Sequence, residues 1–329
     1  MRWKWIVGSF VVLSAIGYLA FRLSPWPSVL LIRRTFEKDT INRNRALEAH
    51  LPRSITELYN QRYGNGNDAL LDVFFPSGTS DVQTGLPTII WVHGGAFVYG
   101  DKSDVANYLK IVSERGFTTV GINYSLAPGA RYPTPVKQLN EALGFLVRNA
   151  DRFRIDTSKL FFAGDSAGSQ IVAQLAEIVS DPTYAATVGI RPTIDRARVK
   201  GVVLFCGIYD ASKLNFDGPF GSFLKTVIWS YFGTRDFVGL PQLSQFSIAR
   251  HLNPRFPPAF VSAGNNDPLA NQSLLMADAL REQGTAVETV FFPRDYQPPL
   301  PHEYQFDLET TAGREALEKM TAFISRLAR

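Results

Sequence analysis

From about residue 69 to its end, the chain alternates short apolar runs with longer stretches that we interpret as helices. Alternation of this kind is typical of a mostly parallel sheet with helices packed on both faces. The predicted strands are LLDVFF (70–75), TIIWVHGG (88–95), TTVGINY (118–124), KLFFAGD (159–165), VKGVVLFCG (199–207), PAFVSAG (258–264) and AVETVFF (286–292). The predicted helices are 104–115, 136–149, a helix that follows the fourth strand and ends at 180, 273–283 and 313–329. We therefore expect an α/β fold.

Residues 208–254 interrupt this alternation. The segment lies between two predicted strands and is rich in aromatic side chains, among them Tyr209, Phe223 and Trp229. A cap over the carboxyl end of the sheet is inserted at such a position, so we interpret the segment as a lid.

A separate apolar run, IVGSFVVLSAIGYLAF (residues 6–21), precedes the alternating region and is flanked by arginines, Lys4 and tryptophans. At about 1.5 Å per residue it is somewhat short for a hydrocarbon core of about 30 Å, but the flanking side chains are those that anchor at membrane interfaces. The run has no polar face, which disfavours a buried amphipathic helix. We expect residues 1–24 to be a single-pass N-terminal membrane anchor. The alternative is a signal peptide whose cleavage gives a secreted protein.

The rest of the chain divides into two parts. Residues 25–54 are expected to form a linker or lid helix, and residues 55–329 the main domain with its 208–254 insertion.

Composition narrows the functional classes. With 45% hydrophobic and 19% charged residues, the chain has the composition of a globular protein. Its single cysteine, Cys206, excludes an intramolecular disulfide framework, and its four histidines are not paired at metal-ligand spacing, so we expect no metal. The formal net charge of +4, without a long basic run, gives no reason to expect nucleic-acid binding and suits an anionic membrane surface.

A nucleophile is predicted at Ser166. It is the central residue of GDSAG (164–168), a G-x-S-x-G motif that follows a predicted strand and opens a helix. A sharp strand-to-helix turn needs small neighbours and lifts the hydroxyl clear of the sheet, while the amino end of the helix favours a developing oxyanion. The alternative reading is an ordinary helix cap bracketed by glycines.

Backbone donors are predicted in HGGAF (93–97), at the end of another strand. Glycine allows close approach of the backbone to a ligand, and preorganised N–H groups are what acyl transfer requires beside a nucleophile. His93 itself is expected to be structural.

These motifs resemble those of the α/β-hydrolase superfamily and, within it, the hormone-sensitive-lipase-like esterases, over about residues 55–327. The segments that carry the resemblance are HGGAF (93–97), YSLAP (124–128), GDSAG (164–168), DPL (267–269) and His302. The resemblance implies the α/β-hydrolase fold and hydrolysis of carboxylic esters through an acyl-serine intermediate, without a cofactor. It implies Ser166 as nucleophile, His302 as base, Asp267 as the acid that orients it, and an oxyanion hole at Gly94, Gly95, Ala96 and Ala167.

Rival residues exist for the base and for the acid. In α/β-hydrolases the acid and the histidine follow the serine along the chain, which removes His50 and His93. His251, at the end of the presumed lid, is the rival to His302, which follows the last strand. For the acid, Asp210 and Asp295 are the rivals to Asp267, which comes directly after the strand at 258–264.

Three departures from the family pattern bear on the substrate. Ala96 replaces the usual third glycine, Asn123-Tyr124-Ser125 stands where Asp-Tyr-Arg is customary, and Ala270-Asn271 follows DPL in place of an acid. These departures bear on the subfamily and the substrate and not on the catalytic residues, so the resemblance still implies a serine esterase, which we expect to act on apolar acyl or acetyl esters. An arylformamidase-like amidase, a sugar or sterol deacetylase, and a catalytically silent ligand-binding protein are the alternatives.

Overall fold

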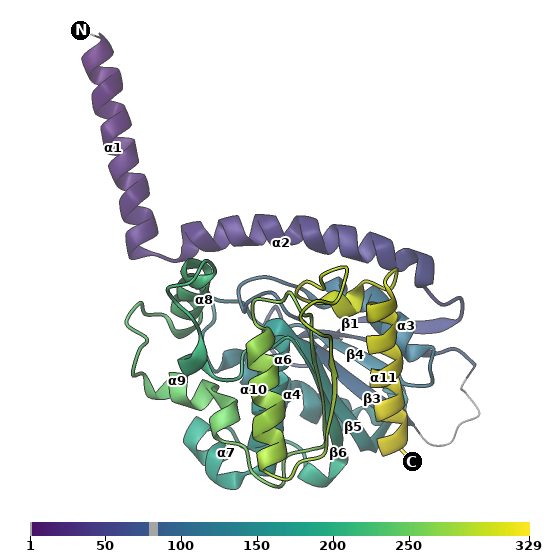
Figure 1. Cartoon of the computed structure of the whole chain (residues 1–329). Coiled ribbons are helices and arrows are strands. Elements are labelled where there is room, and N and C mark those ends of the chain that lie inside the picture. The colour runs from purple at the N-terminus through teal and green to yellow at the C-terminus, as the bar shows by residue number, and fades with distance from the viewer. Residues whose placement is uncertain (1, 79–84) are drawn as a thin grey trace.

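The core of the structure, a computed structural model that describes residues 2–78 and 85–329, is a sheet of eight strands (Figure 1). Their spatial order is β1-β2-β4-β3-β5-β6-β7-β8. Strand β2 runs antiparallel to both of its neighbours, and every pair from β4 to β8 is parallel. The strands are β1 (Ile55–Arg62), β2 (Leu70–Pro76), β3 (Leu86–Val92), β4 (Thr118–Ile122), β5 (Ile155–Asp165), β6 (Val199–Phe205), β7 (Ala259–Ala263) and β8 (Val287–Phe291).

Helices connect and cover these strands. They are α1 (Arg2–Leu23), α2 (Trp26–Leu47), α3 (Ala106–Ser113), α4 (Thr134–Arg148), α5 (Ala150–Phe153), α6 (Ser166–Ser180), α7 (Pro182–Val188), α8 (Gly221–Phe232), α9 (Pro241–Phe246), α10 (Ala270–Glu282) and α11 (Thr311–Leu327).

The sheet separates two apolar cores. Successive side chains of a strand point to opposite faces, so Ile90 and Val92 of β3 pack into one core and Ile89 and Trp91 into the other. Helices α4, α6 and α10 contribute to the first core, and α3 and α11 to the second. The predicted mostly parallel sheet with helices on both faces is therefore confirmed.

One strand was absent from the sequence-based prediction. Strand β1 (Ile55–Arg62) lies at the edge of the sheet, and most of its side chains are partly or fully exposed. Its sequence, ITELYNQR, lacks the continuous apolar run by which the buried parallel strands were identified. The edge position is therefore the reason that the pattern did not reveal it.

The N-terminal region forms two long helices with different surroundings. Helix α1 projects away from the body, and α2 lies across the top of the domain (Figure 1). Residues Trp5–Leu23 of α1 are long and apolar enough to cross a membrane, with a mean hydropathy of 1.9, and none of that stretch is buried. Arg33 on α2, by contrast, donates from Nε to the carbonyl oxygen of Val98 over 2.7 Å, so α2 is fixed to the domain.

The 208–254 segment lies between β6 and β7 and contains α8 and α9. Its aromatic side chains pack on one another and also on the rest of the domain. Tyr231 stacks on Phe97, with ring centroids 4.1 Å apart and an interplanar angle of 9°. Because Phe97 follows the His-Gly-Gly sequence at the end of β3, this contact joins the inserted segment to the site described next.

Candidate active site

Ser166 is the first residue of α6 and follows β5 directly. Its φ of +50° lies in the left-handed region, which is uncommon for a residue with a side chain. The turn is possible because the residues two positions before and after Ser166 are glycines. A Cβ on Gly164 would lie 2.6 Å from the carbonyl carbon of Gly168, and a Cβ on Gly168 would lie 1.9 Å from the carbonyl oxygen of Val92. Both glycines of the G-x-S-x-G motif are therefore sterically required.

His302 and Asp267 reach Ser166 from the loops that follow the last two strands. Nε2 of His302 lies 2.9 Å from Oγ of Ser166, and its Nδ1 lies 2.9 Å from Oδ2 of Asp267. The other carboxylate oxygen of Asp267 accepts a hydrogen bond from the N–H of Leu269 at 2.7 Å, and the Asp267 side chain is fully buried. The structure thus brings together the three residues singled out from the sequence.

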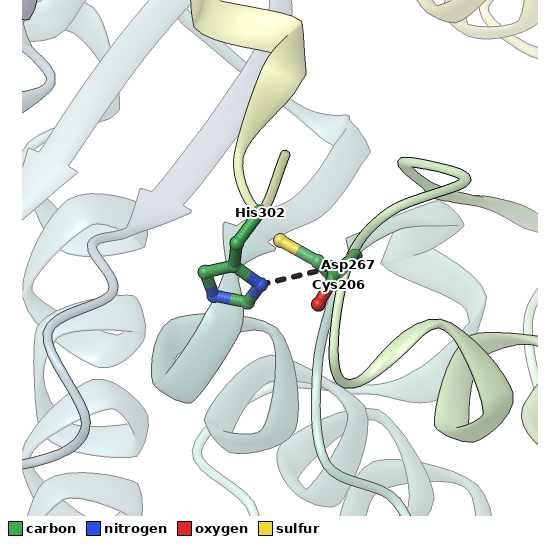
Figure 2. Close-up of side chains that lie close together, drawn as sticks. All are labelled: Cys206, Asp267 and His302. Atoms are coloured by element: carbon green, nitrogen blue, oxygen red, sulfur yellow. Dashed lines mark hydrogen bonds and ion pairs between the residues drawn. The ribbon is translucent and has the colours of Figure 1, made fainter. Parts of the chain in front are cut away.

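Cys206 lies beside the same histidine, as Figure 2 shows. Burial raises the pKa of its thiol to about 11, so the thiol is protonated at neutral pH. Burial lowers the pKa of His302, whereas the hydrogen bond to the Asp267 carboxylate raises it, and the net direction is upward. Because the neighbouring thiol of Cys206 is uncharged, the carboxylate is the group that stabilises the imidazolium. One ligand-type atom from each of Cys206, Asp267 and His302 lies within 4.8 Å of the others. Asp267 and His302 already bond to each other there, so we assign this cluster to the serine site.

The HGGAF loop lies beside Ser166. Gly95, Ala96 and Phe97 all have positive φ, at +99°, +54° and +62°. A Cβ on Gly95 would lie 2.1 Å from the carbonyl oxygen of Tyr99, so only glycine fits there. Within residues 2–78 and 85–329, the N–H groups of Gly95, Ala96 and Ala167 have no acceptor. They are therefore available to an oxyanion.

Gly94, which was expected to contribute to the oxyanion hole, has a different role from the other three residues. Its N–H donates to Oδ2 of Asp165 over 2.8 Å, so it is not available to a substrate oxygen. A Cβ on Gly94 would lie 2.4 Å from Oδ2 of Asp165 and 2.7 Å from Oε1 of Glu303. Gly94 thus allows two carboxyl groups to approach the loop.

These two carboxyl groups form a hydrogen-bonded pair that the sequence did not reveal, in which Asp165 is buried and Glu303 is partly exposed. Burial, followed by the charge of Glu303, raises the pKa of Asp165 well above its ordinary value. Burial also acts to raise the pKa of Glu303, but Arg43 and His302 outweigh it and lower that pKa. Asp165 is therefore the protonated partner and donates to the Glu303 carboxylate, which Arg43 of α2 contacts at 2.5 Å. In the sequence, Asp165 directly precedes Ser166 and Glu303 directly follows His302, and these two positions are the only local indication of the pair.

The rival residues lie in other surroundings. Nε2 of His251 bonds to the carbonyl oxygen of Ser244 at 2.8 Å, and Asp210 caps a short helix by accepting from the N–H of Ser212. Asp295 is exposed. Burial lowers the pKa of His93 to about 4, so its ring is neutral, and its Nδ1 donates to the carbonyl oxygen of Gly94 at 2.9 Å. His93 is therefore structural, as expected.

A cavity of about 550 Å³ opens onto Ser166 and His302. Helix α2 contributes Phe36, Thr40 and Arg43 to its wall, and α8 contributes Phe223, Leu224 and Val227. The wall is thus largely apolar and is formed by the N-terminal region together with the inserted segment. The site therefore combines the Ser166 hydroxyl, a histidine bonded to it, a buried carboxylate bonded to that histidine, and N–H groups without an acceptor among the described residues. This arrangement is able to transfer acyl groups.

Comparison with known families agrees with this geometry. The profile of the α/β hydrolase fold family matches residues 89–296, more than half of the chain. The chain belongs to this family. The matched part includes Ser166 and Asp267, and His302 follows it.

Several solved structures of esterases are similar over nearly the whole chain. Esterase B from Lactobacillus rhamnosis has a TM-score of 0.77 at 21% identity, with 92% of this chain and 96% of that chain covered. A hyperthermophilic esterase from the archaeon Pyrobaculum calidifontis has a TM-score of 0.71 at 22% identity, with 91% and 94% covered. EstE1, a thermostable carboxylesterase from a metagenomic library, has a TM-score of 0.70 at 20% identity, with 94% and 99% covered. At these identities the similarity establishes the fold.

Proposed function

We propose that this α/β hydrolase is a serine esterase that cleaves apolar carboxylic esters. The observation that carries the proposal is the unbroken series from Ser166 Oγ through His302 to Asp267, with 2.9 Å at each step, at an apolar cavity. A hydroxyl needs a base to attack at neutral pH, and a histidine that is oriented by a carboxylate is suited to that task.

Acylation begins when Nε2 of neutral His302 accepts the hydroxyl proton of Ser166 and Oγ attacks the ester carbonyl carbon. The negative charge that develops on the carbonyl oxygen is stabilised by the N–H groups of Gly95, Ala96 and Ala167. Asp267 keeps the proton of His302 on Nδ1 and stabilises the imidazolium. The tetrahedral intermediate then breaks its bond to the alkoxy oxygen, which leaves as the alcohol with the proton from Nε2.

Deacylation repeats these steps with water in place of the serine hydroxyl. His302 accepts a proton from water, the hydroxide attacks the acyl carbon, and the proton is returned to Ser166 Oγ as the acid leaves. One ester and one water give one acid and one alcohol, so the cycle balances without a cofactor.

The substrate class is inferred from the cavity and from a related structure. Aromatic and aliphatic side chains of α2, α8 and the HGGAF loop offer an acyl chain an apolar surface. Esterase B of Lactobacillus rhamnosis, which shares the fold, has a structure with a tributyrin phosphonate inhibitor. A phosphonate mimics the tetrahedral intermediate of ester cleavage, so we expect Ser166 to react with such inhibitors.

Labelling with a fluorophosphonate tests the proposal. Wild-type protein should be labelled in proportion to time, and Ser166→Ala should not be labelled and should lose at least about 10⁴-fold of its ester turnover. His302→Ala should lose a similar factor because the two residues act as a unit. His251→Ala is the matched control and should keep its turnover, because its ring bonds to Ser244. Labelled protein that cleaves aryl formamides but not esters would replace the esterase by an amidase.

We also propose that α1 attaches the enzyme to a membrane. Its apolar stretch is long enough and is not buried by any of the residues that the structure describes. After washing of membranes with alkaline carbonate, the full chain should stay in the pellet, whereas a cleaved signal peptide would give a soluble product. Deletion of residues 1–24 should release the protein with its fluorophosphonate labelling intact.

A further inference from the structure

The outer face of α2 combines basic and apolar side chains. At about 100° per residue, six exposed residues fall within one sector of about 100°. Glu37 lies about 20° beyond one edge of this sector, and Asp39, which lines the cavity, lies about 80° beyond the other. We call this sector the outer face. It consists of Leu30, Leu31, Arg34, Lys38, Ile41 and Arg45. Leu31 is 55% exposed and Ile41 52%, which is unusual for large apolar side chains on a helix that is otherwise packed on a domain.

The opposite side of α2 is fixed to the enzyme. Arg33 donates to the carbonyl oxygen of Val98, and Arg43 pairs with Glu303 beside His302. Phe36 and Thr40 line the cavity between these two contacts. Because contacts along its length hold α2 in place, the outer face cannot turn inward to bury its leucines.

The cations of the outer face have no carboxylate partner. None of the ion pairs within the described part of the chain includes Arg34, Lys38 or Arg45. Each basic residue near an anionic membrane surface favours binding by about fivefold. Cationic and apolar side chains on one helix face are typical of helices that lie in the interface of a bilayer.

The junction with α1 orients this face. Helix α1 leaves α2 at a steep angle, on the side away from the sheet (Figure 1). Arg235, from the 208–254 segment, donates to the carbonyl oxygen of Phe21 at 2.8 Å and stacks over Trp229, with 4.0 Å from its guanidinium carbon to the ring centre. A spanning α1 would therefore hold α2 roughly parallel to the membrane plane.

We propose that the outer face of α2 lies on an anionic lipid surface, so that one helix forms both the lipid contact and the wall of the catalytic cavity. The proposal rests on the membrane attachment by α1 proposed above. An α-helix is about 10 Å thick, so the cavity would lie about one helix diameter from the lipid head groups. Apolar esters dissolved in the membrane would then have a short path to Ser166.

Single-site labelling tests the orientation of α2 in the full-length protein. Cys206 is buried, so an exposed cysteine introduced by substitution can be labelled selectively with a bimane fluorophore. We would compare Ile41→Cys on the outer face with Glu282→Cys, exposed at the end of α10 that lies away from Asp267. The proteins are reconstituted in phosphatidylcholine vesicles with about a quarter phosphatidylserine and with lipid-borne nitroxide quenchers.

We expect at least about twofold stronger quenching at position 41 than at position 282. Replacing Arg34, Lys38 and Arg45 together by glutamate should lower the quenching at position 41 to that at position 282. Turnover of a short, water-soluble ester should not change, because none of the three residues lines the cavity.

Flotation of the vesicles separates the two proposals. Protein that floats through α1 but shows equal quenching at positions 41 and 282 overturns the proposed lipid contact and leaves the anchor intact. Quenching at position 41 that survives the charge reversal overturns the requirement for an anionic surface. Protein that does not float overturns both the anchor and the lipid contact.

Discussion

Replacing Arg43 by methionine removes the positive charge that contacts Glu303 of the carboxyl pair and keeps most of the aliphatic volume. Arg43 and Glu303 are 21% and 20% exposed, and their side chains are 2.5 Å apart. Breaking a buried ion pair by removing one partner costs about 3–5 kcal/mol, and partial exposure places this pair at the lower end. The guanidinium also lies 4.5 Å from the ring centre of Phe306, a contact worth about 1 kcal/mol. We expect Arg43→Met to lower the free energy of unfolding by about 3 kcal/mol at pH 8.

The loss should depend on pH in a defined direction. Burial acts to raise the pKa of Glu303, and Arg43 is the main group that lowers it below 4.5. The wild-type pair therefore stabilises the fold above the unfolded pKa, and that stabilisation is lost as pH falls through the folded pKa. Without Arg43, burial holds the pKa of Glu303 above its unfolded value, so the variant becomes less stable as pH rises. Its deficit should shrink to about 1 kcal/mol near pH 4.

Urea unfolding of the full chain in a mild non-ionic detergent, followed by tryptophan fluorescence at both pH values, measures these differences. Lys319→Met is the matched control. Lys319 pairs with Glu315 at 2.6 Å on the exposed side of α11, so its loss should change the free energy by no more than about 0.5 kcal/mol. Arg43→Met combined with Glu303→Gln should regain much of the stability at pH 8. A deficit that is the same at both pH values would refute the assignment of the charge to Glu303.

Three further predictions concern the site and its support. Asp267→Asn should lower turnover by about 10⁴-fold, because an amide favours the wrong tautomer of His302, whereas the exposed control Asp295→Asn should change it little; steady-state ester kinetics decide between them. His302 must be neutral to accept a proton, and its pKa lies above the usual 6.5. The kcat/KM of the wild type should therefore begin to fall above pH 6.5 as the pH is lowered, and a profile that is half-maximal below pH 6 would contradict this. A chain that begins at residue 53 lacks Arg43 and the part of the cavity wall that Phe36 forms. It should therefore melt at a lower temperature than the full chain in a thermal scan, and an unchanged midpoint would show that α2 does not support the site.

The sequence predicted most of the fold because buried parallel strands and their helices carry local signals. Strands such as β3 and β6 are buried on both faces, so each appears as a short apolar run. Both faces of strand β1 mix polar and apolar residues, and its place in the sheet is determined by its pairing with β2 and not by its own composition. An edge strand of this kind is not recognisable from periodicity alone.

Ser166 and the HGGAF loop could be predicted for a related reason: their backbone geometry restricts which residues are possible. Gly164, Gly95 and Gly168 stand where a Cβ would collide with the main chain, so the requirement appears as a motif. His302 has no such local signature, and Asp267 has only the short DPL segment. Chain order with respect to the strands was therefore needed to select them over His251, Asp210 and Asp295.

The support of the site by α2 was not predictable from the sequence, because it depends on pairs of residues that are far apart along the chain. Arg43 and Glu303 are separated by 260 positions. Within its own segment, each looks like an ordinary charged surface residue. Only the fold shows that the residue after His302 is an ionised carboxylate, that the residue before Ser166 is its protonated partner, and that α2 carries the compensating charge. The segment expected to be a linker or lid helix is thus bonded to both ends of the serine site, through Glu303 beside His302 and, by way of Asp165, to Gly94. A displacement of α2 would move a charge away from groups that adjoin both the base and the nucleophile. The support of the site and the lipid contact proposed for the outer face are therefore expected to depend on α2, whereas the anchor itself depends on α1.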